Sequence, residues 1–299
     1  MSLLAPRWRG QRGRLEVWYG TITAEDGEGV WVHYEIVAPD EGAPYGHGWI
    51  ARFPVAGAPV WERFGPDAVV ADEGEERLLS GKTASMAWQL AFEDGGEPLY
   101  TFPRAAWEKE FLPGAQIVPL PTATVRGWIE QDGARTELVG RGGLARIYGH
   151  GSAKRWGWLH ADLGDGEVLE IVAGVSRRPG LDRLPPAPFV QLRAGGVDWP
   201  RNPLAAAPLF RARLGLPEWK VSGTVGRRRL RVSVDQPADR CIAVDYTDPD
   251  GAGAVCTNTE RANAEIVVER WSGRWQKERA WVLDGTAHAE IGTRPEEDA

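Results

Sequence analysis

Sulfur-containing and imidazole side chains are scarce in this sequence. Its 299 residues include 2 Cys, 2 Met and 5 His. Two cysteines are too few for a disulfide framework or a four-cysteine zinc site, and no zinc-protease helix motif occurs, so we expect no metal site. Cys241 and Cys256 flank a turn signal at residues 248–251, and a hairpin would set them nearly opposite each other. In a reducing compartment we favour two free thiols over a disulfide between them.

Long apolar runs are missing as well. No stretch approaches the roughly 18–20 apolar residues that a membrane helix needs. The N-terminal segment carries Arg7, Arg9, Arg12 and Arg14, but no apolar stretch follows as it would in a secretory signal. We therefore expect no membrane span and a cytoplasmic location.

The sequence also lacks the motifs of most common cofactor enzymes. It has no phosphate-binding loop, no dinucleotide-binding glycine motif and no Gly-x-Ser-x-Gly nucleophile elbow. Its formal net charge of −7 disfavours a nucleic-acid partner, because phosphate binding depends on clustered cations. The one basic cluster, residues 227–229 with Arg231, is expected to be a solvated strand face or a turn.

Tryptophan, glycine and proline are abundant instead, with 15 Trp, 37 Gly and 22 Pro. Short segments of alternating apolar and polar residues are separated by Gly, Asp and Pro, which is the pattern of antiparallel strands and turns. The clearest predicted strands are 15–23, 30–37, 125–131, 134–139, 156–163, 167–173, 221–225, 230–234 and 264–269. Helices are predicted only at 104–112 and 204–214. The sequence therefore predicts an all-β fold of antiparallel barrels or sandwiches with few short helices.

A proline-rich stretch divides the chain. The length suits one large all-β domain or two medium ones. Residues 176–188 contain four prolines and predict a linker. We place the boundary there, which gives domains 1–180 and 181–299.

Three histidines share one spacing to a carboxylate. The pairs are His33 with Glu35, His160 with Asp162, and His288 with Glu290. Residues i and i+2 of a strand point to one face, so each acid can orient its imidazole and raise the imidazole pKa. Trp31 and Trp158 precede the first two pairs by two residues and extend the same face. These faces fit either a barrel-lining site or a solvated surface with a half-buried Trp, and the third pair, which lacks the Trp, also fits coincidence.

The sequence Gly-His-Gly occurs twice, around His47 and His150. Flanking glycines let the backbone turn sharply or approach a ligand closely. For His47 we favour a β-bulge or loop with an exposed imidazole. His150 is the stronger candidate because it lies between Tyr148 and Trp156 in a dense set of aromatic and ionisable residues. We expect the His150→Ala variant to fold normally but to bind ligand or react less well.

Four motifs carry a family resemblance. They are Glu16-Val17-Trp18-Tyr19, Gly127-Trp128-Ile129, the segment from Tyr148 to Trp158, and Ala287-His288-Ala289-Glu290-Ile291-Gly292. Their order and spacing over nearly the whole chain resemble the tocopherol cyclase, carotenoid 1,2-hydratase and AttH-like superfamily. The resemblance implies two lipocalin-like antiparallel β-barrel domains.

The resemblance also implies a deep apolar pocket for a terpenoid, polyene or polyketide-like ligand, and acid chemistry or shape-directed cyclisation without a cofactor. Tryptophan faces can stabilise a developing carbocation, and protonation of an alkene needs an acid in a water-poor cavity. The candidate catalytic residues are His150, Asp162, Glu290 and Tyr148. The candidate ligand-binding residues are Trp18, Trp31, His33, Glu35, Trp156, Trp158 and His160.

We therefore expect a cofactor-independent cyclase, hydratase or isomerase acting on an apolar natural product. A non-catalytic carrier of a hydrophobic small molecule is the main alternative, because fold does not fix function. A stress-related or scaffold protein with a vestigial pocket is a third. Catalysis is favoured if His33, Glu35, His160 and Asp162 line one cavity.

Overall fold

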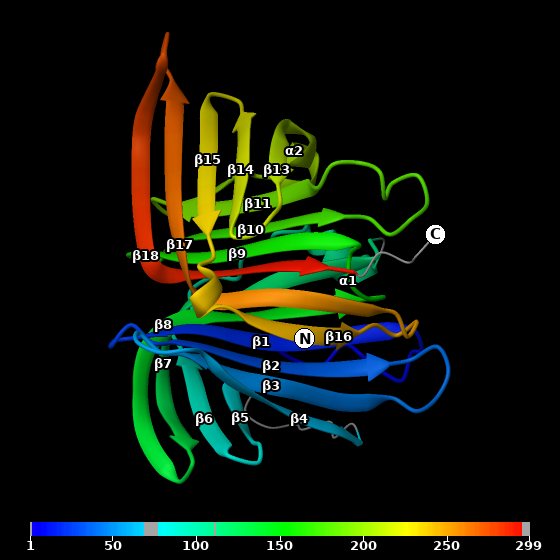
Figure 1. Cartoon of the computed structure of the whole chain (residues 1–299). Coiled ribbons are helices and arrows are strands. Elements are labelled where there is room, and N and C mark those ends of the chain that lie inside the picture. Colours follow the sequence, from blue (N-terminus) through cyan, green and yellow to red (C-terminus); the bar gives the residue numbers. More distant parts are fainter. Residues whose placement is uncertain (1, 69–76, 111, 295–299) are drawn as a thin grey trace. The chain divides into compact units, whose positions relative to one another are not determined.

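The strands form two antiparallel sheets, one in each of two units (Figure 1). A computed structural model describes residues 2–68, 77–110 and 112–294. Contacts group Met1–Gly151 with Thr247–Ala252, which we call unit 1, and Ser152–Tyr246 with Gly253–Ala299, which we call unit 2. The predicted all-β class is confirmed.

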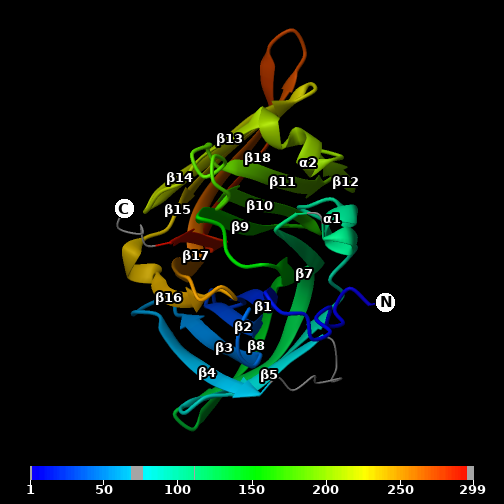
Figure 2. The ribbon, with the colours of Figure 1, turned by 90° about the vertical axis from the view of Figure 1, so that its right-hand side faces the viewer.

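Unit 1 holds an eight-stranded sheet in the order β4-β3-β2-β1-β8-β7-β6-β5. Its elements are β1 (Arg14–Ala24), β2 (Gly29–Ala38), β3 (Tyr45–Phe53), β4 (Val60–Ala68), β5 (Leu78–Lys82), β6 (Met86–Glu93), α1 (Arg104–Lys109), β7 (Gly114–Gln131) and β8 (Ala134–Gly149). Glu62 of β4 accepts hydrogen bonds from Thr83 Oγ1 and Ser85 Oγ at the turn between β5 and β6. These bonds link the two outer strands, and Figure 2 shows β4 curving toward β5. The sheet is therefore nearly closed into a barrel.

Unit 2 holds a ten-stranded sheet in the order β12-β11-β10-β9-β18-β17-β15-β14-β13, with β16 paired to β17. Its elements are β9 (Arg155–Gly164), β10 (Glu167–Val175), β11 (Ala187–Ala194), β12 (Val197–Trp199), α2 (Pro203–Ala206), η1 (Ala207–Leu209), β13 (Phe210–Arg213), β14 (Glu218–Val225), β15 (Arg228–Asp235), η2 (Ala238–Arg240), β16 (Ile242–Thr247), β17 (Gly253–Trp271) and β18 (Trp275–Thr293). Trp199 and Phe210 pack edge to face, with ring centroids 5.9 Å apart, and bring the two ends of this sheet together.

Each sheet keeps its apolar core on one face. Along β2, Val32 belongs to the core of unit 1, and His33 points to the other face because successive strand residues alternate. Along β9, Leu159 belongs to the core of unit 2, and His160 points to the other face. In both sheets the histidines therefore lie on the face opposite the apolar core.

The hairpin of β17 and β18 bends, as Figure 1 shows, and its ladder is interrupted. Thr259 pairs with Ala289 and Ala262 with Ala287, so Glu260 and Arg261 together face His288 alone. This two-against-one arrangement is a β-bulge, which bends a strand and redirects its side chains. The bulge aims Glu260 at His288.

The predicted strands all lie within observed ones, but the second helix is shorter than predicted. The prediction for 204–214 is wrong beyond Leu209, because Phe210–Arg213 pairs with β14 as strand β13. The first predicted helix, 104–112, ends at Lys109, and its position 111 lies outside the described residues. In the described part of the chain, no helix has the length and apolar character needed to cross a membrane.

The division between the units also lies elsewhere than the boundary predicted after residue 180. Contacts place the change at Gly151. The reason is that β9 pairs with β18, and β10 pairs with β11, so both strands belong to the sheet of unit 2. The proline-rich stretch joins β10 to β11 inside that unit.

Candidate active site

A transverse row of four ionisable side chains crosses the sheet of unit 2. Glu170, His160 and His288 are direct neighbours across β10, β9 and β18, and the bulge of β17 adds Glu260. We call these four residues the His–Glu row. Their exposed fractions are 0%, 1%, 2% and 0%, so the whole row is buried. Buried charges of this kind persist only when they are paired.

Glu170 holds His160 in one orientation. His160 Nδ1 lies 2.7 Å from Glu170 Oε2, and Trp158 Nε1 donates to Glu170 Oε1 at 2.6 Å. Burial alone would lower the His160 pKa, but the hydrogen bond and the charge of Glu170 outweigh burial and raise it. His160 Nε2 is buried and forms no hydrogen bond. One ring nitrogen is thus fixed on a carboxylate, and the other is left for a proton transfer.

His288 and Glu260 form the second pair of the row. His288 Nδ1 lies 2.7 Å from Glu260 Oε2. The rings of His288 and His160 have centroids 5.8 Å apart. Two imidazoles, each beside its own carboxylate, therefore face each other on one buried surface. Such an arrangement can hold or pass a proton.

Glu290 lies on the same strand as His288 but has other partners. Trp156 Nε1 donates to its Oε1 at 2.7 Å, and Cys256 Sγ donates to its Oε2 at 3.3 Å. Burial raises the Glu290 pKa, the hydrogen bonds from Trp156 and Cys256 lower it, and the shift is upward overall. A carboxyl with a raised pKa can act as a general acid.

Two of the three predicted histidine–carboxylate pairings need correction. Glu170 hydrogen-bonds His160, and Glu260 forms the ion pair with His288. Side chains directly opposite across strands are about 4.5–5.5 Å apart at Cβ, closer than the i and i+2 positions of one strand. Asp162 acts on His160 through its charge, and its Oδ1 accepts the Gly164 N–H at the hairpin turn.

The first predicted pair, His33 with Glu35, forms as expected in unit 1. His33 Nε2 lies 3.2 Å from Glu35 Oε2, and His47 Nε2 lies 3.8 Å from the same oxygen. Burial alone would raise the Glu35 pKa, but the hydrogen bonds from His33 and His47 lower it to about 2. Burial lowers the pKa of His33. This cluster therefore carries a carboxylate that stays ionised and a His33 ring that favours the neutral form.

Aromatic rings surround this unit 1 cluster. His33 stacks on Trp49 with centroids 3.8 Å apart and planes 9° apart, and Trp31 packs edge-on against both rings. His47 is 7% exposed, so the expected exposed imidazole is wrong there. The expected bulge is present, because the β3–β4 register shifts between Gly46 and Gly48.

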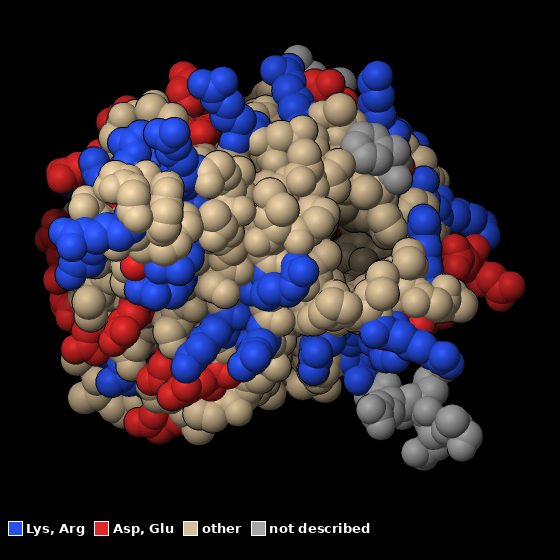
Figure 3. All heavy atoms as spheres, turned by 90° about the horizontal axis from the view of Figure 1, so that it is seen from above, with Lys and Arg blue, Asp and Glu red and all other residues tan. Residues whose placement is uncertain are grey.

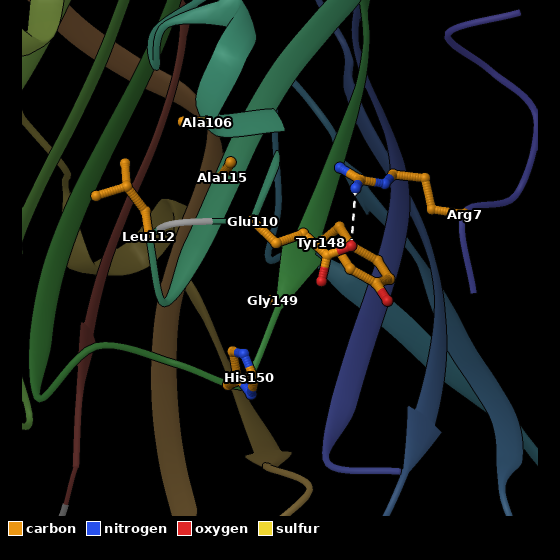
Figure 4. Close-up of a pocket in the computed structure, with 8 residues that line it drawn as sticks. All are labelled: Arg7, Ala106, Glu110, Leu112, Ala115, Tyr148, Gly149 and His150. Carbon is orange, nitrogen blue, oxygen red and sulfur yellow. Dashed lines mark hydrogen bonds and ion pairs between the residues drawn. The ribbon is translucent and has the colours of Figure 1, made fainter. Parts of the chain in front are cut away.

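His150 is exposed at the rim of a hollow in unit 1 (Figure 4). Its Nδ1 lies 3.0 Å from Arg14 Nη1. Tyr148 lines the same hollow and is buried, and burial together with the charge of Glu110 raises its pKa. The structure thus brings Tyr148 and His150 together, as their closeness in sequence suggested.

Trp18 belongs to a different environment, around a buried ion pair that the sequence did not reveal. Arg146 is 0% exposed, stacks 4.9 Å over the Trp18 ring and pairs with Glu16. Arg146 Nη1 also donates to the carbonyl of Ala5 at 2.7 Å, and Glu16 Oε1 accepts the Arg7 N–H at 2.8 Å. The pair anchors the N-terminal segment on the sheet of unit 1.

The basic cluster lies in a turn at Arg227 and on strand β15, as predicted, and Arg228 and Arg229 are also paired with carboxylates. Arg228 binds Glu278 with contacts of 3.0 and 2.7 Å, and Arg229 binds Glu269 at 2.7 Å. The hydrogen bonds from these arginines lower the pKa values of both carboxyls. Figure 3 shows basic and acidic side chains intermixed on the face that it presents.

The two thiols are free, which confirms the prediction. Burial raises the Cys241 pKa to about 11 and also raises the Cys256 pKa, so neither thiol is an activated nucleophile. Among residues 2–68, 77–110 and 112–294, no three His, Cys, Asp or Glu side chains are placed to hold a metal ion.

Comparison with known proteins places the chain among related sequences. A family profile described as tocopherol cyclase-like matches residues 69–293. The proteins described as uncharacterized proteins Rv0493c and MT0513, both of Mycobacterium tuberculosis, are each 48% identical over an alignment of 307 positions, gaps included, that covers 98% of this chain and 90% of theirs.

Solved structures with low sequence identity share the fold. A protein described as AttH from Nitrosomonas europaea is 13% identical, with a TM-score of 0.57 over 94% of this chain and 92% of that one. CghA, solved with Sch210972, is 15% identical, with a TM-score of 0.60 over 94% and 88%. Kievitone hydratase from Nectria haematococca is 12% identical, with a TM-score of 0.56 over 97% and 92%.

Proposed function

Because the chain belongs to the tocopherol cyclase-like family, we propose that it is an enzyme that cyclises, hydrates or isomerises an apolar unsaturated natural product by proton transfer, without a cofactor. The substrate class is a terpenoid, polyene or polyketide-like molecule bound against tryptophan side chains. The kievitone hydratase and CghA folds support this class of reaction by analogy.

One observation carries the proposal: His160 Nδ1 is fixed on Glu170 while the buried Nε2 forms no hydrogen bond. The raised pKa of His160 favours the imidazolium form, which is the proton donor. The neighbouring ring of His288, beside Glu260, provides a second imidazole for returning the proton. Glu290 is a further candidate acid on the same face.

In the proposed step, the His160 Nε2–H bond breaks and the proton goes to one carbon of an electron-rich double bond. The π electrons form the new C–H bond and leave a carbocation on the other carbon. Attack by water, followed by loss of one proton from the added water, completes a hydration. Attack by a second double bond closes a ring and moves the cation to another carbon, and loss of a proton from a neighbouring carbon then completes a cyclisation. Loss of a neighbouring proton without ring closure completes an isomerisation. In all three cases the released proton returns to the neutral His160 ring. The indole face of Trp158 can stabilise the cation by about 0.5–2 kcal/mol.

The test is incubation of the protein with isoprenoid and polyene mixtures in D2O, followed by mass spectrometry. Proton transfer to carbon installs a non-exchangeable deuterium in the product. We expect deuterated product from the wild type and at least a hundredfold less from His160→Gln. Glu218→Gln, an exposed substitution in the same unit, should match the wild type.

Retention of unaltered ligand at stoichiometric amounts, with no deuterated product, would favour a carrier and contradict the enzyme proposal. Equal product from the His160→Gln variant would show that another group transfers the proton.

A further inference from the structure

We infer that the hollow in unit 1 beside α1 binds the carboxylate of a small apolar acid, and that the chain's own Glu110 occupies this site in the free protein. The hollow is partly open to solvent, and with Glu110 in place its cavity volume is about 10 Å³, which is room for about one water molecule. Its residues, drawn in Figure 4, are Arg7, Ala106, Glu110, Leu112, Ala115, Tyr148, Gly149 and His150. This site lies in a different unit from the His–Glu row, so the inference is independent of the proposed function.

Two guanidinium groups converge on Glu110. Arg7 Nη2 donates to its Oε1 at 2.9 Å, and Arg14 Nε lies 3.6 Å from its Oε2. One carboxylate thus faces two arginines, which leaves one positive charge in excess at this point. Arginine pairs favour carboxylates because their donors match both oxygens. A second carboxylate could take the place that Glu110 now fills.

One buried donor near this point lacks an acceptor. Arg14 contacts the buried Tyr148 hydroxyl, but an arginine can only donate, so the hydroxyl proton itself has no acceptor. Tyr148 is 3% exposed, and its ring lies 4.6 Å from the Arg7 guanidinium carbon. A buried donor without an acceptor costs about 1–3 kcal/mol, so an acceptor group supplied by a ligand would remove that cost. Its raised pKa keeps Tyr148 protonated as a donor at neutral pH.

The remaining walls indicate what the carboxylate is attached to. Ala106, Leu112 and Ala115 form an apolar side of the hollow. Burial of methylene groups contributes about 0.8 kcal/mol each. An acid with an apolar chain therefore fits better than a small polar acid.

Glu110 can leave the site because it is not held by burial. Its side chain is 35% exposed, and it ends α1 with a left-handed backbone (φ 51°) that a non-glycine residue adopts at a cost. Exchange of Glu110 for an external carboxylate keeps the arginines paired. The internal carboxylate thus acts as a competitor that sets the affinity for the external one.

The experiment compares binding of octanoate and octanol to the full chain by calorimetry. We expect octanoate to bind and octanol to bind at least tenfold more weakly. Glu110→Gln removes the competing charge and should strengthen octanoate binding at least fivefold. Tyr148→Phe, which removes one donor and keeps the ring, should weaken it threefold or more. Arg104→Gln, an exposed arginine of α1 that pairs with Glu108, is the matched control and should change nothing.

Equal binding of octanoate and octanol would overturn the inference, as would unchanged octanoate affinity in Glu110→Gln. The His160→Gln variant should bind octanoate like the wild type. A negative deuterium experiment would therefore contradict the proposed enzyme function and leave the carboxylate site unaffected. A negative octanoate experiment would contradict the carboxylate site and leave the proposed role of the His–Glu row unaffected.

Discussion

His160 Nδ1 lies 2.7 Å from Glu170 Oε2, and the two residues are direct neighbours across the β9–β10 ladder. The folded protein raises the His160 pKa above its usual 6.5. The pair therefore stabilises the fold fully below about pH 6.5, and this stabilisation is lost as the pH rises through the raised pKa.

The first prediction concerns this pair. We expect Glu170→Gln to lower the free energy of unfolding by about 3–5 kcal/mol at pH 6, because it leaves a buried imidazolium without its partner. The difference in free energy of unfolding between the wild type and the variant should become smaller as the pH rises toward 9. Urea unfolding of both proteins at a series of pH values measures this difference. A gap that does not change with pH would show that His160 is neutral in the folded protein.

The second prediction concerns Glu35, whose pKa the structure lowers from 4.5 to about 2 through His33 and His47. A lowered carboxyl pKa stabilises the fold above pH 4.5, and this contribution is lost as the pH falls toward 2. Its size is on the order of 3 kcal/mol. We expect the unfolding free energy of the wild type to fall more steeply between pH 5 and 3 than that of Glu35→Gln. Parallel curves would contradict this assignment.

The third prediction uses the two glycines that flank His47. A Cβ at Gly48 would lie 2.0 Å from the His33 carbonyl oxygen and 2.4 Å from the Phe64 ring, whereas at Gly46 the nearest atom is 3.9 Å away. We expect Gly48→Ala to lower the melting temperature by several degrees or to prevent folding, because backbone must move. Gly46→Ala should melt within about two degrees of the wild type. Similar melting of both variants would mean that β2 and β3 can separate at little cost.

The fourth prediction compares a buried ion pair with an exposed one. Arg146→Met leaves Glu16 buried without its charge partner, and we expect a loss of about 3–5 kcal/mol in unfolding free energy. Adding Glu16→Gln should restore part of that loss, since the unpaired charge is then gone. Arg104→Gln, in an exposed pair on α1, should cost under about 1 kcal/mol. Proteolysis of the N-terminal segment should be faster in Arg146→Met than in the wild type, because Arg146 holds that segment on the sheet. It should be unchanged in Arg104→Gln.

The sequence was sufficient for the fold class and for the faces of the strands, because side-chain alternation is a local property. Trp31, His33 and Glu35 share one strand face, as predicted, and His33 pairs with Glu35. The family motifs indicated the correct family. The partner of His160 could not be predicted in the same way. A regular ladder continued from the Gly164–Glu167 pair would set Ile171 opposite His160, but a one-residue register shift after Glu167 sets Glu170 there.

The role of Glu260 was hidden for a similar reason. It faces His288 only because β17 carries one more residue than β18 at that point. Burial of Arg146 and Glu16 was equally hard to foresee, since charged residues are rarely buried completely. Long-range register and burial of charge depend on contacts between distant segments, which periodicity does not report.

The bulge at Glu260 and Arg261 has a consequence for how the length of the chain can vary. Before it, even-numbered residues such as Asn258 share a face with Glu290; after it, even-numbered residues such as Ala264 enter the apolar core. Loss of one residue elsewhere in β17 would exchange the two faces of the strand beyond that point. Loss of Arg261 would make the ladder regular between Thr259 and Ala262, with Thr259 still opposite Ala289 and Ala262 still opposite Ala287. This is therefore the place in the strand where a homologue could be one residue shorter and keep the same sheet.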